Sequence, residues 1–395
     1  MKNLLATMMV LSLSSFAFAE PTHWVTVDSK ILEKVSPIHK NLLVQKEADG
    51  ISLVQLKESE IEKLSDVIHH ELHRCGGFIT HDTQEEAEQA LRPSGDRVFG
   101  MKGIFNLYTI SQQTEVAPMV SQVQASSIEE TIRKMSSFQN RYYKAATGLE
   151  SQEYVLNLWK NLAQGRSDIK VEYYKHTDWP QPSVIMTIEG SEYPQEIIVV
   201  GGHADSISGG FFGREKAHAP GADDNASGIA TITEAARILI ANNYRPKRTI
   251  QFMAYAAEEV GLLGSKDIAN NYKTQRKSVI GKIQFDMTLR KGTADKDIVL
   301  MSDFTNAAQN EFLGKLIDEY VKVPWGYSRC GYGCSDHASW TNAGFPASIP
   351  FEAEMKDSNK AIHSNRDTIE TAGGDARHSA KFAKLAIAYM VELAH

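Results

Sequence analysis

The sequence has few cysteines, no excess of basic residues and, after its first twenty residues, no long apolar run. Three cysteines in 395 residues exclude a scaffold built on disulfides. The 42 Lys and Arg against 49 Asp and Glu give a formal net charge of −7, which argues against nucleic acid as a partner. Because a membrane-spanning helix needs about 20 apolar residues, we expect no membrane association once the N-terminus is removed. The hydrophobic fraction of 42% is typical of a globular protein.

The first nineteen residues have the features of a secretory signal peptide. Lys2 supplies a positive start, the residues from Leu4 to Phe18 are apolar or small, and Ala17-Phe18-Ala19 fits the small-x-small pattern that signal peptidase reads. We therefore expect the secretion machinery as a partner, cleavage after Ala19 and a secreted protein. The sequence leaves both the periplasm and the extracellular space open as destinations.

The rest of the chain divides into two expected domains. Residues 20–120 have the size of a small separate unit, in which apolar residues at helical spacing from Ile61 to Leu72 predict a helix. The polar stretch from Ser111 to Ser127 is interpreted as a linker. Residues 121–395 form the main domain, and its first helix is expected to open with the capping box Ser127-Ile-Glu-Glu130.

In the main domain, apolar strand patterns alternate with amphipathic helices. This alternation predicts an α/β fold with a mostly parallel or mixed central sheet and helices on both faces. The strands are expected at 184–188, 197–200, 249–255 and 283–287 and in the apolar run 347–351, and the helices at 154–162, 229–240, 262–272 and 382–393.

Acidic residues and histidines follow the ends of these strands. In open α/β sheets, sites form beyond the carboxyl ends of the strands. The residues found there, or in the loop that opens the helix at 229–240, are His203, Asp205, Asp223, Asp224, Glu258, Glu259, Asp286 and His363. No Lys or Arg occupies the same places, and converging carboxylates repel one another. A bound cation would remove that repulsion, so the pattern predicts a metal centre.

The types of ligand favour zinc. Two imidazoles with three carboxylates and no thiolate suit zinc better than calcium, and five ligand residues suit two ions that share a bridging carboxylate and a water. The residues alone leave open whether Asp223 or Asp224 is the bridge. Neighbouring residues at a strand end point in different directions, so one of Glu258 and Glu259 can bind metal while the other acts as a general base.

Five sequence blocks around these residues carry a resemblance to a known family. The blocks are Gly-Gly-His203-Ala-Asp205-Ser, Ala-Pro-Gly-Ala-Asp223-Asp-Asn-Ala-Ser-Gly, Phe-Met-Ala-Tyr-Ala-Ala-Glu258-Glu259-Val-Gly, Gln-Phe-Asp286-Met-Thr and Ile-His363-Ser-Asn-Arg-Asp-Thr. In order and together, they resemble the secreted di-zinc leucyl aminopeptidases of bacteria, and the sequence looks close to the Vibrio enzyme. The resemblance runs from about Ser126 to the C-terminus.

The resemblance implies a role for each of these residues. The resemblance implies two zinc ions, bridged by Asp223 and a water. His203 and Asp286 would complete the binding of one ion, and Glu259 and His363 that of the other. Glu258 would be the general base, and Asp205 would orient His203. The implied activity removes N-terminal residues, leucine or other apolar ones, from peptides with a free N-terminus.

The resemblance also implies features around the metal centre. Relatives have a disulfide loop that matches Cys330 and Cys334, and its tyrosine, Tyr332 here, helps to hold the substrate carbonyl oxygen. The residues implied to form a pocket for the leucine-like side chain are Met287, Phe351 and Ile362. Because apolar residues at strand ends are often core, this pocket has a second interpretation. Met355 replaces an aromatic residue of the pocket wall, and Asn225 replaces an acid.

In relatives, the N-terminal unit is a propeptide that assists folding, blocks the site and is removed. The resemblance therefore implies a propeptide over residues 20–120, with a processing protease cutting between residues 105 and 125. Cys75 has no assigned pairing. We expect a monomer.

Other functions are possible for such a scaffold. A carboxypeptidase would need a basic cluster for the substrate carboxylate, and no Arg/Lys motif flanks these ligands. Deacylases and glutaminyl cyclases are further alternatives, although cyclases of this type use one zinc. A binding protein on an inactive version of the fold would have lost ligands, and a serine hydrolase would have a Gly-x-Ser-x-Gly elbow, which is absent.

Overall fold

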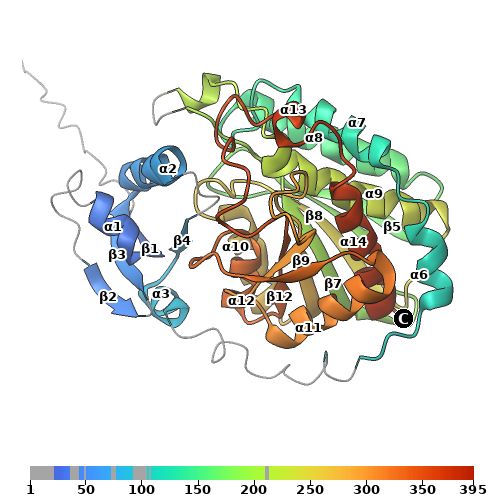
Figure 1. The fold of residues 1–395 in the computed structure, drawn as a ribbon. Helices are drawn as coiled ribbons and strands as arrows, with labels where there is room; N and C mark the ends of the chain where they lie inside the picture. The colour runs from blue at the N-terminus through green and yellow to red at the C-terminus, as the bar shows by residue number, and fades with distance from the viewer. Residues whose placement is uncertain are drawn as a thin grey trace, which may run out of the picture.

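The computed structural model describes residues 22–35, 44–48, 50–72, 77–91, 105, 108–209 and 213–395, which form a small N-terminal unit and a larger unit (Figure 1). The expected signal peptide and Cys75 lie outside the described residues. Among the helices that the structure describes, none has the length and apolar character needed to cross a membrane.

The N-terminal unit is an antiparallel sheet with helices, drawn in blue in Figure 1. Its strand order is β2-β3-β1-β4. The elements are β1 (Thr22–Asp28), α1 (Ser29–Val35), β2 (Val44–Ala48), β3 (Ile51–Lys57), α2 (Glu58–Leu72), β4 (Phe78–His81) and α3 (Gln84–Ala90). The helix expected from Ile61 to Leu72 is confirmed as part of α2. Its buried Leu64 and Ile68 share a core with Val25 and Val54 of the sheet.

The larger unit is built on a six-stranded mixed sheet with the order β12-β9-β7-β8-β6-β5. The first four strands run parallel, and β6 is antiparallel to β8 and β5. The strands are β5 (Ile169–Tyr174), β6 (Ser183–Ile188), β7 (Tyr193–His203), β8 (Arg248–Tyr255), β9 (Ser278–Gln284) and β12 (Ala347–Ser348). A smaller sheet contains β10 (Ile298–Met301), β11 (Trp325–Ser328) and β13 (Pro350–Phe351).

Helices cover both faces of the six-stranded sheet, so the expected mixed α/β class is confirmed. The helices are α6 (Gln113–Val120), α7 (Ala125–Ser136), α8 (Ala146–Leu162), η1 (Arg214–Lys216), η2 (Ala222–Ser227), α9 (Gly228–Ala241), α10 (Leu263–Thr274), α11 (Ala307–Leu316), η3 (Ile317–Val321), α12 (His337–Ala343), α13 (Ile369–Ala372) and α14 (Ser379–Leu393). Adjacent strand residues point to opposite faces. Val184 and Phe252 pack with α8, α9 and α14, whereas Ile185 and Met253 pack with α10 and α12.

The segment expected to be a linker is part of the larger unit. In place of an extended connection, α6 and α7 bury Val116 and Ile132 in the large core. At the start of this segment, the Glu392 carboxylate of α14 accepts hydrogen bonds from the backbone amides of Ser111 and Gln112, both at 3.0 Å. The polar composition that suggested a linker belongs to the exposed faces of these helices.

The capping box expected at Ser127 does not form. Helix α7 begins two residues earlier, at Ala125, and its N-cap residue Gln124 makes no side-chain capping bond. The Gln124 amide instead donates to the Glu234 carboxylate of α9 at 2.7 Å. The start of this helix is thus set by a tertiary contact that the local pattern could not reveal.

The N-terminal unit packs against the larger unit. Ile79 of β4 lies in an apolar cluster with Leu262 and Phe304. Thr80 Oγ1 donates to the Gly261 carbonyl at 3.2 Å. These contacts place the small unit over the segment that follows β8.

Candidate metal centre and active site

The acidic residues and histidines singled out in the sequence converge at one edge of the six-stranded sheet. His203 is the last residue of β7, Glu258 and Glu259 follow the end of β8, and Asp286 lies two residues beyond β9. These three strands are parallel, so their carboxyl ends share this edge. The strand expected at 283–287 is shorter than predicted, because β9 ends at Gln284. His363 reaches the same place from the segment between β13 and α13, and it is 4% exposed.

Asp224 lies between the two histidines. Its Oδ1 is 3.0 Å from His203 Nε2, and its Oδ2 is 2.9 Å from His363 Nε2. Glu259 Oε2 is 3.0 Å from the same nitrogen of His363, and Asp286 Oδ1 is 3.5 Å from His203 Nε2. The five side chains therefore form two groups, His203 with Asp286 and His363 with Glu259, which Asp224 joins.

The position expected for Asp223 is wrong, because its neighbour Asp224 occupies it. Asp223 Oδ1 accepts the Leu289 amide at 3.0 Å, and its Oδ2 accepts Asn359 Nδ2 at 3.0 Å. These bonds direct the Asp223 carboxylate away from the histidines. Both aspartates follow a left-handed glycine, Gly221, in the irregular turn η2. Only the backbone path through that turn decides which carboxylate faces the site, so the sequence alone could not distinguish the two.

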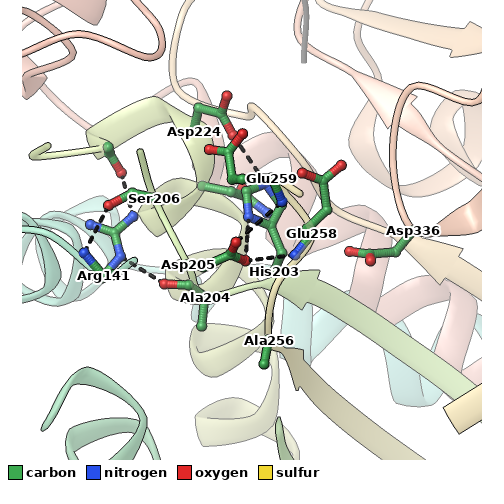
Figure 2. Close-up of polar contacts among 12 residues, drawn as sticks. Arg141, His203, Ala204, Asp205, Ser206, Asp224, Ala256, Glu258, Glu259 and Asp336 are labelled. Carbon is green, nitrogen blue, oxygen red and sulfur yellow. Dashed lines mark hydrogen bonds and ion pairs between the residues drawn. The ribbon is translucent and has the colours of Figure 1, made fainter. Parts of the chain in front are cut away.

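Asp205 contacts three parts of the site (Figure 2). Its Oδ1 is 3.4 Å from His203 Nδ1, as expected for a residue that orients this histidine. The two carboxylate oxygens also accept the backbone amides of Glu258 and Glu259, at 3.0 and 3.1 Å. Asp205 thus contacts the His203 side chain and the backbone of the two glutamates, and the sequence indicated only the first of these contacts.

Glu258 lies at the same centre and, among the described residues, has no hydrogen-bond partner for its carboxylate. Its carboxylate is fully buried, and its nearest contact to His203 Nε2 is 4.0 Å. In the part of the chain that the structure describes, neither of its oxygens has a hydrogen-bond partner. A buried carboxylate in this state is costly, and it has both oxygens available for a water or substrate proton.

The electrostatics of the cluster show strong mutual repulsion. Burial raises the pKa of Glu258 well above its ordinary range, and the adjacent Glu259 carboxylate raises it further against the opposing effect of His203. Burial likewise raises the pKa of Glu259 to about 7. For His363, burial disfavours the charged imidazole, but the carboxylates of Glu259 and Asp224 outweigh it and raise its pKa to about 10. In the absence of a cation, the shifts favour protonation of Glu258, Glu259 and His363.

The donor set fits divalent metal ions. Ligand atoms of His203, Asp224 and Glu259 lie within 4.8 Å of one another, and so do those of His203, Glu258 and Asp286. Nitrogen and oxygen donors without a thiolate match zinc or a similar borderline ion. Positive charge at this place would take over the role of the bound protons, so the site has both the geometry and the electrostatics of a metal centre.

The residues expected around the centre also come together. A disulfide joins Cys330 and Cys334, with a Cα–Cα distance of 6.2 Å, and Tyr332 within this loop is 2% exposed. The expected pocket residues Met287, Phe351 and Ile362 share one buried apolar cluster, against which Cys330 and Met355 pack. The disulfide loop and the apolar cluster are therefore neighbours beside Asp286.

Several residues that hold the ligands were missed by sequence reasoning. Asp367 accepts the backbone amides of both Asp223 and Asp224, at 3.2 and 3.0 Å. Ser335 Oγ donates to Asp286 Oδ2 at 2.5 Å. Asp367 belongs to the block Ile-His363-Ser-Asn-Arg-Asp-Thr, which was a signal, whereas Ser335 had none beyond its position after Cys334.

Arg141 is a further buried residue that the sequence did not single out. Its guanidinium donates to the backbone carbonyl of Ala204 at 2.8 Å (Figure 2). It also donates to the backbone carbonyls of Pro220 and Gly221, at 2.5 and 2.9 Å. Burial lowers its pKa to about 10, although the nearby carboxylates oppose this shift. Arg141 thereby fixes the backbone beside His203 and the turn that carries Asp224.

The backbone at the site is unusual as well. Ala257, Met287 and His363 have positive φ angles of 54°, 54° and 55°. Non-glycine residues in this region are uncommon and strained, and they concentrate at functional sites. Each of the three belongs to the cluster or is the neighbour of one of its residues, and this conformation aims the side chains in ways that strand periodicity cannot predict.

Comparisons with known proteins agree with this site. A model of "Peptidase family M28" matches residues 183–390. A probable aminopeptidase of Saccharomyces cerevisiae, YDR415C, is 36% identical over 293 residues, which are 72% of this chain and 77% of that protein. A probable leucine aminopeptidase of Arthroderma benhamiae is 35% identical over 351 residues, 87% of this chain and 93% of that protein.

Two crystal structures from Legionella pneumophila are similar over nearly the whole chain. The LapA aminopeptidase has a TM-score of 0.81 and 31% identity, covering 95% of this chain and 99% of its own. LapB has a TM-score of 0.80 and 28% identity, covering 95% and 100%. Each match covers 95% of the chain, which is more residues than the segment 105–395 contains. Both matches therefore include part of the N-terminal unit.

Proposed function

This chain belongs to peptidase family M28 and is a metallo-aminopeptidase, and on that premise we propose that it uses two zinc ions to remove leucine or other apolar residues from peptide N-termini. The observation that carries this proposal is Asp224, whose two oxygens contact His203 and His363 at 3.0 and 2.9 Å. A carboxylate so placed is suited to bridge two ions. The leucine preference is supported by the relatives' names and by the apolar cluster beside the site.

His203 and Asp286 would hold one ion, Glu259 and His363 the other, and Asp224 both. When bound, the two ions would supply a water of lowered pKa and a positive charge for the substrate carbonyl. Asp205 would keep His203 in the correct orientation through its 3.4 Å contact with Nδ1. Ser335 would do the same for Asp286.

Glu258 would be the general base. Its buried oxygens lie among the ligands without a hydrogen-bond partner in the described part of the chain, and burial raises its pKa so that it can accept a proton. In the reaction, a Glu258 oxygen would take the proton of the attacking water and pass it to the departing amine. The Tyr332 hydroxyl would donate to the carbonyl oxygen as negative charge develops.

The apolar cluster of Met287, Phe351 and Ile362 would receive the first side chain of the peptide. These residues are 1–3% exposed and border the disulfide loop through Cys330. The apolar side chains of this cluster would favour leucine-like side chains over charged ones.

We further propose that the chain is secreted through residues 1–19 and that the N-terminal unit is a propeptide. Ser65 of α2 donates to the Glu259 carbonyl at 3.2 Å, so this unit sits directly on a residue of the centre. Phe105 is 2% exposed and packs on Phe312 of α11, with 6.0 Å between ring centroids. Because the chain from Phe105 onward packs on the larger unit, we propose that processing occurs before Phe105, at the start of or ahead of the window 105–125 expected from the sequence. Such a cut would release the small unit and leave the catalytic core complete.

The experiment that tests the proposed function is a substrate panel. Leucine p-nitroanilide, its N-acetyl derivative and a peptide with a C-terminal leucine separate aminopeptidase, deacylase and carboxypeptidase activities. The proposal requires cleavage of the first compound, none of the other two, and loss of activity with a zinc chelator. Cleavage of the acetylated compound or of the C-terminal leucine would point to the alternative hydrolases.

A further inference from the structure

Arg214 is a buried cation of the larger unit that the N-terminal unit covers. It lies in η1, in the segment that connects β7 to the turn carrying Asp224, and its side chain is 3% exposed. Its guanidinium contacts two residues of α2. Nη1 donates to Ser65 Oγ at 3.1 Å, and Nη2 is 3.7 Å from Asp66 Oδ1.

The same serine connects Arg214 to the metal centre. Ser65 Oγ accepts from Arg214 and donates to the Glu259 carbonyl at 3.2 Å. The guanidinium therefore lies two hydrogen bonds from the backbone of a residue whose carboxylate contacts His363. These two bonds, of 3.1 and 3.2 Å, place the guanidinium within about two residues of extended peptide of the Glu259 carbonyl, because consecutive Cα atoms are about 3.8 Å apart.

The contacts with α2 satisfy Arg214 only in part. Within the described residues, its Nε and Nη2 have no hydrogen-bond acceptor. An arginine stays charged, and its planar fork is shaped to hold a carboxylate by two parallel bonds. The Asp66 carboxylate at 3.7 Å is near enough to attract it but too distant for a hydrogen bond. The guanidinium thus has room for a closer anion once α2 is gone.

A cavity between the two units has room for a peptide, although Arg214 is not among its lining residues. Its volume is about 430 Å³, and it is bordered by Ile61, one turn of α2 before Ser65, and by Val260, the residue after Glu259. On the larger unit, its walls are the apolar or aromatic residues Tyr143, Trp179, Val260 and Leu263, the cations Lys144 and Lys266, and one acid, Asp178. Removal of the N-terminal unit would open this surface, which is apolar with an excess of positive charge.

From this geometry we infer that Arg214 is a specificity residue, which binds the C-terminal carboxylate of short peptide substrates whose amino end lies at the metal centre. The inference rests on the proposed aminopeptidase function and on release of the N-terminal unit. In the unprocessed chain, Ser65 and Asp66 occupy the place of that carboxylate. In the processed enzyme, a peptide with two or three residues would span from the centre to Arg214, and this contact would favour short peptides with a free carboxylate.

The test compares peptide acids with their amides. Full-length protein is produced, and the processed enzyme that it yields is assayed with Leu-Gly, Leu-Gly-Gly and Leu-Gly-Gly-Gly, with the C-terminal amide of each, and with leucine p-nitroanilide. We expect the wild-type KM to be at least tenfold lower for the acid than for the amide at one length of this series. Arg214→Gln is expected to raise KM for that acid at least tenfold while it changes the amide and the p-nitroanilide less than threefold. Arg214→Lys should retain part of the difference.

The matched control is Lys216→Gln, which removes an exposed cation from the same η1 helix. It should leave the acid–amide difference unchanged. The inference is overturned if the wild type treats acids and amides alike, if Arg214→Gln weakens all substrates equally, or if Lys216→Gln has the same effect as Arg214→Gln. If the wild type cleaves neither the peptides nor the p-nitroanilide, the proposed function itself has failed, and mass spectrometry of the purified protein shows whether the N-terminal unit was removed.

Discussion

The charged residues at the two edges of the six-stranded sheet differ in their partners and in their burial. At the amino edge, next to β5, Asp168 is paired with Arg166 at 2.6 Å and with Arg245, and the side chain keeps 20% of its surface exposed. At the same edge, Arg248 of β8 contacts Glu196 of β7 at 2.5 Å. At the carboxyl edge, the carboxylates are buried, and the described residues offer them histidines and backbone amides in place of a direct Lys or Arg partner.

This contrast separates a structural charge from a functional one. The hydrogen bond from Arg166 is the largest effect on Asp168 and holds its pKa below the ordinary value. At the carboxyl edge, burial and neighbouring carboxylates raise the pKa of Glu258 and Glu259. An anion that has its own cation stabilises the fold, whereas a group of anions without one is arranged for a ligand that brings positive charge.

The largest expected effect comes from Glu258. Glu258→Gln removes the proton acceptor without removing a proposed ligand, so kcat should fall by about 10²- to 10⁴-fold while zinc content stays at the wild-type value. Steady-state kinetics and metal analysis of the same preparation measure both quantities. A near-normal kcat would show that Glu258 is not the base, and a loss of zinc would show that it is a ligand.

The neighbouring aspartates provide the next test. Asp224→Asn should reduce both bound zinc and activity strongly, because a neutral amide is a poor bridge between two cations. Asp223→Asn is its matched control, since it keeps the side-chain volume and the turn, and its carboxylate is bonded to the Leu289 amide and to Asn359. We expect the Asp223 variant to be at least about tenfold more active than the Asp224 variant. The reason is that Asp224→Asn removes a proposed metal ligand, whereas Asp223→Asn only weakens supporting hydrogen bonds. The reverse order would restore the bridging role that the sequence suggested for Asp223.

A smaller effect is expected from Asp205. The Asp205 carboxylate now accepts hydrogen bonds from the backbone amides of Glu258 and Glu259. In Asp205→Asn, the side-chain NH₂ group would face one of these two amides, so one of the hydrogen bonds would be lost. Supporting residues of this kind change metal affinity by about 10- to 100-fold, so the zinc dissociation constant should rise by that factor in a chelator competition. An unchanged constant would mean that His203 and the glutamates are held by other contacts.

The smallest effect is expected at the amino edge. Asp168→Asn should leave kcat and KM unchanged and should lower the free energy of unfolding by less than about 1 kcal/mol, as for a partly exposed ion pair. The pKa of this carboxyl is lowered in the folded state, so its contribution is fully present above its unfolded pKa of about 3.9 and is lost progressively as the pH falls from that value through the lower folded-state pKa. Urea unfolding at pH 7 and pH 3 measures the difference, which should be smaller at pH 3 than at pH 7. An effect on activity would contradict the division between the two edges.

The sequence predicted at which edge of the sheet the site lies better than it predicted which side chains face the site. Strand ends that carry His203, Glu258 and Asp286 could be found from periodicity, because the carboxyl ends of parallel strands must meet. The choice of Asp224 over Asp223 depends on a turn with irregular backbone, and the aim of His363 depends on a positive φ. Neither conformation has a periodic pattern from which it could be predicted.

The regions outside the sheet show the same limit. The polar segment from Ser111 to Ser127 was interpreted as a linker, yet Glu392 at the other end of the chain holds its first residues. Arg141 looked like an ordinary surface cation in the sequence, but its bonds to the Ala204, Pro220 and Gly221 carbonyls bury it beneath the site. Contacts between segments far apart in the sequence decide both cases, and local composition carries no information about them.

The most direct test of the metal centre is a crystal structure of the zinc-loaded protein with anomalous scattering measured at the zinc edge. We expect two peaks, one contacted by His203 and Asp286 and the other by Glu259 and His363, with Asp224 touching both. A single peak, peaks away from these residues, or an Asp223 carboxylate between the ions would contradict this expectation.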